Sequence, residues 1–280
     1  TVSLWNFKTG KLVDKTEKYD HHEIGIDPRG NFLAVTTQAN DLCLFKTNAG
    51  STTLPQVPAA ARWHATGDLN GPHFFPDSNR IAISCGRTGD LTESPVNTVW
   101  LLGLPRLDAA EQIPLPNPGE FAISPDGTLM AIGNQAGLAL WHVGSRKFVW
   151  KVAQSALIKR MAFSPDGKLL ATGGDERTVT VRHVSNGTVQ HELHSHRTRI
   201  RAVHFSADSR TLASASDGVL KLWHVPTGRE LIEFTVPKAE SFRQIEFTHD
   251  GNHLLWGVHR YDQHRDELIV FDTVEEHHEP

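Results

Sequence analysis

The stretch that decides the fold is Met161-Ala-Phe-Ser-Pro165-Asp166-Gly167, a short apolar run ending in a tight-turn sequence and followed by the apolar residues 169–171. Proline fixes φ at the second position of a turn, aspartate bonds to the backbone that follows it, and glycine accepts a positive φ. We therefore predict that the two apolar runs are neighbouring antiparallel strands of one hairpin.

The same hairpin sequence recurs along the chain. The equivalent turn residues are Pro28, Pro76, Pro125, Pro165, Ala207 and His249. The last four are 40, 42 and 42 residues apart. A period of about 40 residues indicates repeated units, each too small to bury its apolar faces alone.

A second pattern recurs with about the same period as the turns. It is a strand with alternating apolar and polar residues that ends in a bulky residue. These residues are Trp5, Phe45, Trp100, Trp141, Arg182, Trp223 and Phe271. Each period therefore has room for four short strands. Residues 1–5 are predicted to be a third strand and residues 11–16 a fourth, so the first unit lacks its two inner strands. We expect the chain to be part of a longer protein.

These patterns predict an all-β chain, a β-propeller of four-stranded antiparallel blades, because stacked sheets cover each other's faces. We expect seven blades, the first of them incomplete, in a single domain spanning residues 1–280. The expected repeats are 1–16, 17–60, 61–112, 113–152, 153–192, 193–235 and 236–280.

Composition excludes several classes of protein. No apolar run approaches the roughly 18 to 20 residues that span a bilayer, and no signal-peptide pattern is visible, so we expect a cytoplasmic protein without membrane contact. With 28 Lys and Arg against 32 Asp and Glu, the formal net charge of -4 argues against nucleic acid as a partner. Cys43 and Cys85 lie inside apolar runs and are expected to be buried free thiols.

One repeat resembles a known family closely. It contains the segments 193–196 and 200–203, then Leu212-Ala-Ser214-Ala-Ser216-Asp217-Gly218, then Leu222-Trp223-His224. This repeat resembles the WD repeat, and the likeness is strong from Phe121 onward. The Phe-Ser-Pro-Asp-Gly turns are similar to those of bacterial WD-repeat proteins, which are often the regulatory or sensor part of a larger protein.

The resemblance implies a hydrogen-bonded tetrad of His196, Ser214, Asp217 and Trp223. Its expected role is structural, because a buried imidazole needs partners on both nitrogens. The repeat at 154–184 departs from the family pattern, with Gln154 in place of the His and Arg182 in place of the Trp. The aspartate of the family's name is also replaced, by His142, His183 and His224.

Cations recur at one position early in the innermost strand of three successive units. Lys159, Arg201 and Arg243 each stand four residues before a phenylalanine, and Arg160 and Arg199 lie close by. In WD repeats peptide partners commonly bind at this end of the inner strands. We hypothesise a basic arc that binds an acidic or phosphorylated segment. The alternative is a set of ordinary solvated charges that neighbouring carboxylates satisfy.

These features favour a non-enzymatic scaffold for protein–protein interaction in signalling, which acts as a monomeric domain without cofactor, metal or catalytic residues. The histidines of 191–196 lack the spacing of a known zinc motif. The alternative is a hydrolase or metal-dependent enzyme with a site at the central channel, formed by residues such as His22, His73 and Glu120.

Overall fold

The computed structural model describes residues 2–6, 11–16, 21–37, 39–46, 61–65, 67–86, 98–113, 120–134, 137–153, 157–194, 196–235, 241–248, 250–260 and 265–272. These residues form 25 β-strands and no α-helix, which confirms the prediction of an all-β chain. Consequently no described segment is a helix that could cross a membrane. The strands form seven antiparallel sheets, of which five have the four strands of a propeller blade.

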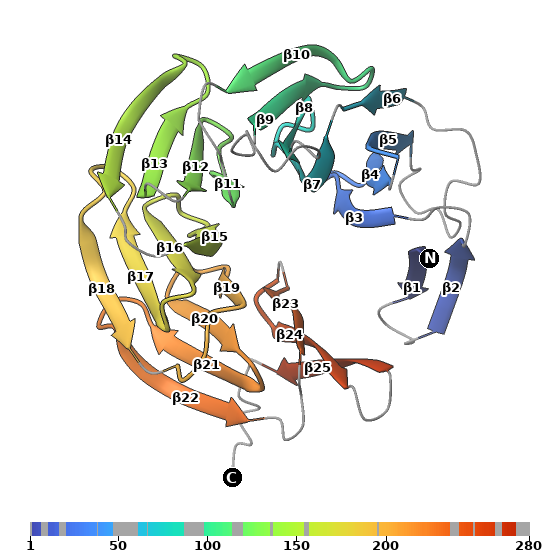
Figure 1. The fold of residues 1–280 in the computed structure, drawn as a ribbon. Coiled ribbons are helices and arrows are strands. Elements are labelled where there is room, and N and C mark those ends of the chain that lie inside the picture. The colour runs from blue at the N-terminus through green and yellow to red at the C-terminus, as the bar shows by residue number, and fades with distance from the viewer. Residues whose placement is uncertain are drawn as a thin grey trace, which may run out of the picture. The chain divides into compact units, whose positions relative to one another are not determined.

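The first of two compact units spans Thr1–Pro118 and holds one two-stranded and two four-stranded sheets (Figure 1). The two-stranded sheet pairs β1 with β2, and the predicted bounds of the second strand, 11–16, are confirmed. The strands of this unit are β1 (Val2–Asn6), β2 (Lys11–Thr16), β3 (His21–Ile26), β4 (Phe32–Thr37), β5 (Asp41–Lys46), β6 (Ala61–His64), β7 (Asp68–Phe74), β8 (Arg80–Gly86), β9 (Thr98–Gly103) and β10 (Asp108–Ile113).

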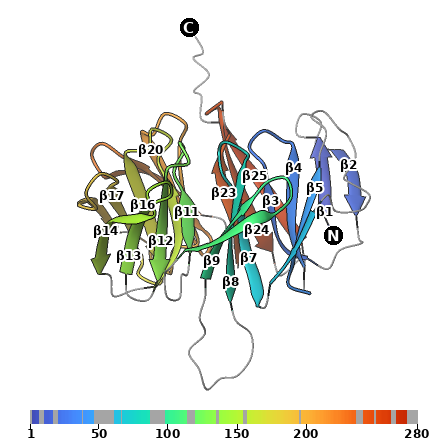
Figure 2. The same cartoon turned by 90° about the horizontal axis from the view of Figure 1, so that it is seen from above.

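The second unit spans Gly119–Pro280 and holds three four-stranded sheets and one three-stranded sheet, with β14, β13, β12 and β11 side by side in Figure 2. Its strands are β11 (Phe121–Ile123), β12 (Leu129–Asn134), β13 (Gly137–His142), β14 (Lys147–Ala153), β15 (Ile158–Phe163), β16 (Leu169–Gly174), β17 (Thr178–His183), β18 (Val189–His194), β19 (Ala202–Phe205), β20 (Thr211–Ser216), β21 (Val219–His224), β22 (Arg229–Thr235), β23 (Ser241–Phe247), β24 (His253–Arg260) and β25 (Arg265–Asp272).

The predicted turns connect the first and second strands of the sheets in the second unit. The Ser164 hydroxyl donates to Asp166 Oδ1 over 2.6 Å and accepts from the Leu169 N–H over 2.9 Å. Gly167 completes the turn with a φ of 71°. Serine or threonine bonds to aspartate in the same way at Ser124, Ser206 and Thr248. One short sequence thus builds four equivalent hairpins.

Neighbouring sheets of the second unit bury their apolar faces against each other. Its innermost strands β11, β15, β19 and β23 contact one another in chain order along the inner side of an arc (Figure 1). Between the sheets β15–β18 and β19–β22, Val179 and Val181 pack in one cluster with Phe205, Leu212 and Trp223. Burial of apolar surface between sheets is therefore the main stabilising contribution, as the repeat pattern predicts.

The first unit uses the same kind of packing. Leu42 and Leu44 of β5 lie in one buried cluster with Ile81 and Ile83 of β8. Cys43 and Cys85 are buried free thiols, as predicted. Burial raises the pKa of the Cys43 thiol, which keeps it in the neutral form of a core side chain.

Candidate functional site

A buried hydrogen-bond network joins the loop before β19 to strands β20 and β21. His196 Nε2 lies 2.7 Å from Ser214 Oγ, and His196 Nδ1 lies 2.8 Å from Ser216 Oγ. The Trp223 Nε1–H donates to Ser214 Oγ over 2.7 Å. Ser214 and Ser216 reach the same imidazole because residues two apart on a strand face the same side.

The imidazole of His196 is neutral in this environment. Burial and the positive charge of Lys221 lower the pKa of His196 to about 4. A neutral imidazole donates through one nitrogen and accepts through the other, so the two serine hydroxyls match it with one acceptor and one donor. The network is therefore complete without a charged group.

Asp217, which the family resemblance places in this network, bonds elsewhere. Its Oδ1 accepts from Arg201 Nε over 3.0 Å, and its own N–H donates to Thr198 Oγ1 over 3.2 Å. Ser216, rather than Asp217, is the second partner of the His196 ring. The physical reason is that Ser216 lies in the strand and points inward, whereas Asp217 begins the turn and is half-exposed.

The serine and histidine of this network are enclosed within the sheet. Ser214 is fully buried, and its hydroxyl oxygen already contacts both His196 and Trp223. A nucleophilic serine must be reachable by substrate and lie beside an oxyanion site. We therefore assign the network to locking the loop before β19 onto the sheet.

Lys221 lies beside the network and is a feature that the sequence analysis missed. Its side chain is only 3% exposed, and its ammonium donates to both carboxylate oxygens of Glu230 over 3.0 Å and also to Glu233. Burial by itself would lower the pKa of Lys221, but the bonds to the two glutamates raise it. The signal in the sequence is a lysine between two leucines, opposite a strand that carries two glutamates three residues apart; a register shift between Leu222 and Trp223 brings both glutamates within reach.

Histidines at the position of the family aspartate bond to the turn that follows. The Ser145 N–H donates to His142 Nδ1 over 3.1 Å, and His224 Nδ1 lies 2.9 Å from Thr227 Oγ1. In the divergent repeat, Arg182 occupies the tryptophan position and donates to the Gly187 carbonyl over 3.3 Å. Gln154 lies outside the described residues.

The predicted basic arc, which we call the cationic rim, consists of Lys159, Arg160, Arg199, Arg201 and Arg243. In the two neighbouring sheets the equivalent cations have equivalent partners: Lys159 Nζ lies 2.9 Å from Asp175, and Arg201 Nε lies 3.0 Å from Asp217. Arg199 is exposed. The side chain of Arg243 lies outside the described part of the chain.

Arg160 links the two sheets at this rim. Its Nε donates to the Arg201 carbonyl over 2.7 Å, and its Nη1 donates to the Lys159 carbonyl over 2.5 Å and lies 3.8 Å from Glu120. Three of the four described cations, Lys159, Arg160 and Arg201, thus face a carboxylate each. Such half-exposed pairs contribute only about 0 to 1 kcal/mol each, so another anion can replace the carboxylate at little cost.

The other candidate residues have separate environments. Among the described residues, no group of three or more His, Cys, Asp and Glu is arranged to hold a metal ion. His194 bonds to Thr178 Oγ1 over 3.0 Å. His73 lies on β7 of the first unit, and Glu120 lies beside Arg160 in the second. The side chain of His22 is outside the described residues.

Comparison with known proteins identifies the repeats. The model of a family described as the anaphase-promoting complex subunit 4 WD40 domain matches residues 121–208. These residues contain the sheets β11–β14 and β15–β18 and the first strand of the next sheet. The match therefore falls on the part of the chain whose turns and strands are most regular.

Several curated proteins are similar to parts of the chain. Periodic tryptophan protein 2 of Arabidopsis thaliana is 36% identical over 99 residues, which are 35% of this chain and 11% of that protein. Eukaryotic translation initiation factor 3 subunit I of Pyricularia oryzae is 29% identical over 117 residues, 41% of this chain and 34% of that protein. WD repeat-containing protein VIP3 of Arabidopsis thaliana is 26% identical over 193 residues, 62% of this chain and 53% of that protein.

The matched part is thus between about a tenth and about half of the length of these relatives. The repeat period, the four-stranded antiparallel sheets and the histidine–serine–tryptophan network agree with these matches. By these features and similarities, residues 121–208 match a WD40 family model, and the chain is similar to WD-repeat proteins.

Proposed function

We propose that the chain is a non-enzymatic protein-interaction module that binds an acidic or phosphorylated segment of a partner protein at the cationic rim. The observation that carries this proposal is the repetition of one ion pair, Lys159 with Asp175 and Arg201 with Asp217, at the same place in two adjacent sheets. Repetition sets cations at regular intervals, as an extended ligand requires.

The ion pairs of the rim are suited to exchange. The side chains of Lys159 and Arg201 are 36% and 32% exposed, so water and ligands reach their charged groups. A phosphate group carries more charge than a carboxylate and accepts two parallel bonds from one guanidinium. We therefore expect Arg201 to bind an incoming phosphate more strongly than it binds the Asp217 carboxylate.

The relatives support a protein partner. One of them is named as a subunit of a translation initiation factor, and the matching family model is described as that of a subunit of the anaphase-promoting complex. A rigid stack of sheets that presents loops at its ends suits such assembly. A monomeric state, a single-domain arrangement, a cytoplasmic location and a place in a larger bacterial protein stay predictions.

The test measures, by fluorescence anisotropy, how tightly the chain binds a peptide that contains phosphoserine between glutamates. The unphosphorylated form of the same peptide is measured for comparison. Replacing Lys159, Arg201 and Arg243 together by Ala should abolish binding of the phosphorylated peptide. Replacing Asp175 and Asp217 by Asn should strengthen it several-fold, because the competing carboxylates are gone.

The matched control replaces two exposed cations of the turns between first and second strands, Lys168 and Arg210, by Ala. This control should bind like the unchanged protein. Equal binding by the triple Ala variant, or weaker binding by the double Asn variant, would overturn the proposed site.

A further inference from the structure

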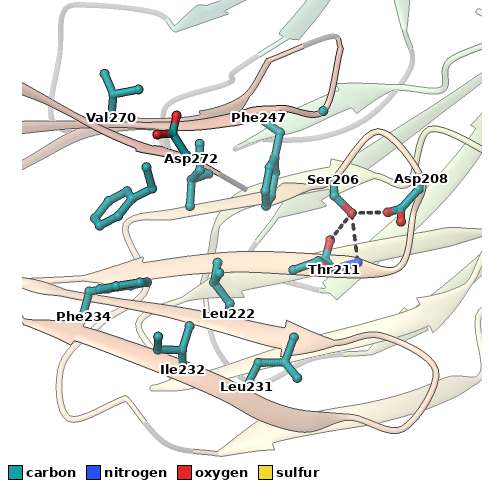
Figure 3. Close-up of a pocket in the computed structure, with 13 residues that line it drawn as sticks. Ser206, Asp208, Thr211, Leu222, Leu231, Ile232, Phe234, Phe247, Val270 and Asp272 are labelled. Carbon is teal, nitrogen blue, oxygen red and sulfur yellow. Dashed lines mark hydrogen bonds between the residues drawn. The ribbon is translucent and has the colours of Figure 1, made fainter. Parts of the chain in front are cut away.

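A histidine of an inner strand connects the last two sheets of the second unit. The Phe247 N–H of β23 donates to His204 Nδ1 of β19 over 3.3 Å. The two rings also lie close together, with centroids 6.1 Å apart. In Figure 3 the Phe247 side chain points from β23 toward the sheet β19–β22, where it belongs to one buried cluster with Ala202 and Ala213. His204 therefore lies at the contact between two sheets that pack through apolar side chains.

The Phe247 N–H is directed out of its own sheet. Thr248, the next residue, donates its N–H to the His253 carbonyl within the hairpin β23–β24. Alternate amides of an antiparallel strand point to opposite sides, so the Phe247 N–H points away from β24. A backbone N–H at this inner edge needs another partner, and His204 supplies the acceptor.

The same position is filled differently in the neighbouring inner strands. His204 precedes Phe205, which pairs with Leu212, the second residue of β20. By the same register, the residue at this position is Ala162 in β15 and Ala122 in β11. Alanine has no side-chain acceptor. His204 thus gives its sheet contact a hydrogen bond that Ala122 and Ala162 cannot make.

The bond fixes the protonation state of the imidazole. A backbone N–H can only donate, so His204 Nδ1 accepts and carries no proton, and the ring is neutral with its proton on Nε2. Burial lowers the pKa of His204 below its ordinary value, although the charge of Glu246 and a hydrogen bond with the Phe205 backbone act to raise it. The packed sheets therefore favour the neutral ring near pH 7.

Glu246 of β23 is the carboxylate that acts on His204. Of the other strands that pack against β19, β16 and β20 carry no charged residue. The cations of the remaining two strands belong to the cationic rim: Lys159 and Arg160 of β15, and Arg243 of β23, whose side chain lies outside the described residues. Lys159 and Arg160 face Asp175 and Glu120. Glu246 is therefore the partner available to a charged His204.

We propose that His204 is a pH-operated joint between the sheets β19–β22 and β23–β25. The neutral ring accepts from the Phe247 N–H and holds β23 against β19. The protonated ring carries an N–H at both nitrogens, so it cannot accept from Phe247 and pairs instead with the carboxylate of Glu246, the preceding residue of the same strand. Acidification thus exchanges one partner on β23 for its neighbour and releases the backbone of β23 at its inner edge.

The joint acts locally. The cluster that packs the two sheets together also contains Ile245, Leu254 and Trp256, none of which titrates. Acid should therefore open the inner edge of β23 while the sheets stay folded. The joint is independent of the proposed binding at the cationic rim, because neither His204 nor Glu246 belongs to that rim.

The test follows the Phe247 amide of the 280-residue chain by NMR from pH 7 to about pH 4.5. Its hydrogen exchange is divided by the exchange rate of an unstructured peptide at the same pH. This ratio should rise at least about tenfold as His204 takes up a proton. The Ser124 amide, which donates to the Leu129 carbonyl in another sheet, is the internal control and should keep its protection. Nitrogen spectra of the ring should show His204 Nδ1 without a proton at pH 7.

Two substitutions of His204 separate the hydrogen bond from the charge. His204→Asn places an amide oxygen, bonded to Cγ as Nδ1 is, where the acceptor lies, so the Phe247 amide should be protected equally at both pH values. His204→Phe keeps a ring without an acceptor, so the amide should be unprotected at both. Glu246→Gln removes the partner of the charged ring, so the loss of protection should move to lower pH.

Three results would overturn the proposal. The first is a proton on His204 Nδ1 at pH 7. The second is a Phe247 amide whose protection stays constant while His204 titrates. The third is an equal loss of protection with acid in His204→Asn, which would assign the loss to another titrating group such as His196. If His204→Phe does not fold, the unchanged chain and His204→Asn still decide between these outcomes.

Discussion

Replacing Ser216 by Ala tests the buried network most sharply, because Ser216 is the partner that the family pattern does not contain. The hydroxyl lies 2.8 Å from His196 Nδ1, and Ser216 and His196 are 2% and 6% exposed. The substitution leaves a buried ring nitrogen without its partner, which costs about 1 to 3 kcal/mol. Asp217→Asn removes a half-exposed ion pair and should cost at most about 1 kcal/mol.

Urea denaturation followed by tryptophan fluorescence measures both variants. With an m-value of about 3 kcal/mol/M, a loss of about 2 kcal/mol lowers the midpoint by roughly 0.7 M. Ser185→Ala, in an exposed turn, is the control and should leave the midpoint in place. A larger loss for Asp217→Asn than for Ser216→Ala would refute the assignment of Ser216 to the network.

Three further predictions follow from the described contacts. The pKa of His196 is lowered to about 4 in the folded chain, so the unfolded chain takes up a proton at this residue at higher pH than the folded chain does. Acidification from pH 7 to pH 5 should therefore lower the free energy of unfolding by about 2 kcal/mol through His196. Urea denaturation at several pH values should show a weaker pH dependence for His196→Gln. Lys221→Met should change the stability measured by thermal unfolding only slightly. Replacing both Glu230 and Glu233 by Gln should lower the free energy of unfolding by about 3 kcal/mol or more, because the buried ammonium of Lys221 loses both of its carboxylate partners. Gly187→Ala should destabilise more than Gly167→Ala in the same assay, because both glycines have positive φ but only the first would place its Cβ 3.0 Å from the Trp150 ring.

The fold could be predicted from the sequence because its determinants are local. The turn at Ser164, Asp166 and Gly167 is specified by bonds within six residues, and it recurs often enough to reveal the period. The bulky residues that the alternation predicts as third-strand markers, such as Trp141 and Trp223, do lie in β13 and β21. Local chemistry repeated many times is sufficient to predict the architecture.

The site could be predicted only in part, because its details depend on side-chain direction. Ser214 and Ser216 alternate with alanines and therefore share a face, but the position of His196 over that face arises from a loop whose path the sequence does not specify. The ion pair between Arg201 and Asp217 likewise depends on two loops approaching each other. The bond between Phe247 and His204 depends on the packing of two sheets and leaves no short motif.

The most direct test of the central proposal, that the chain is a protein-interaction module, is affinity capture from source-cell lysate followed by mass spectrometry. The bait is the 280-residue chain beside its variant with Ala at Lys159, Arg201 and Arg243. We predict that the unchanged chain captures a reproducible set of partner proteins and that the variant does not. In a separate urea denaturation, the variant and the unchanged chain should unfold at the same urea concentration. Capture that is equal with both baits, or turnover of a small substrate without any enriched protein, would contradict it.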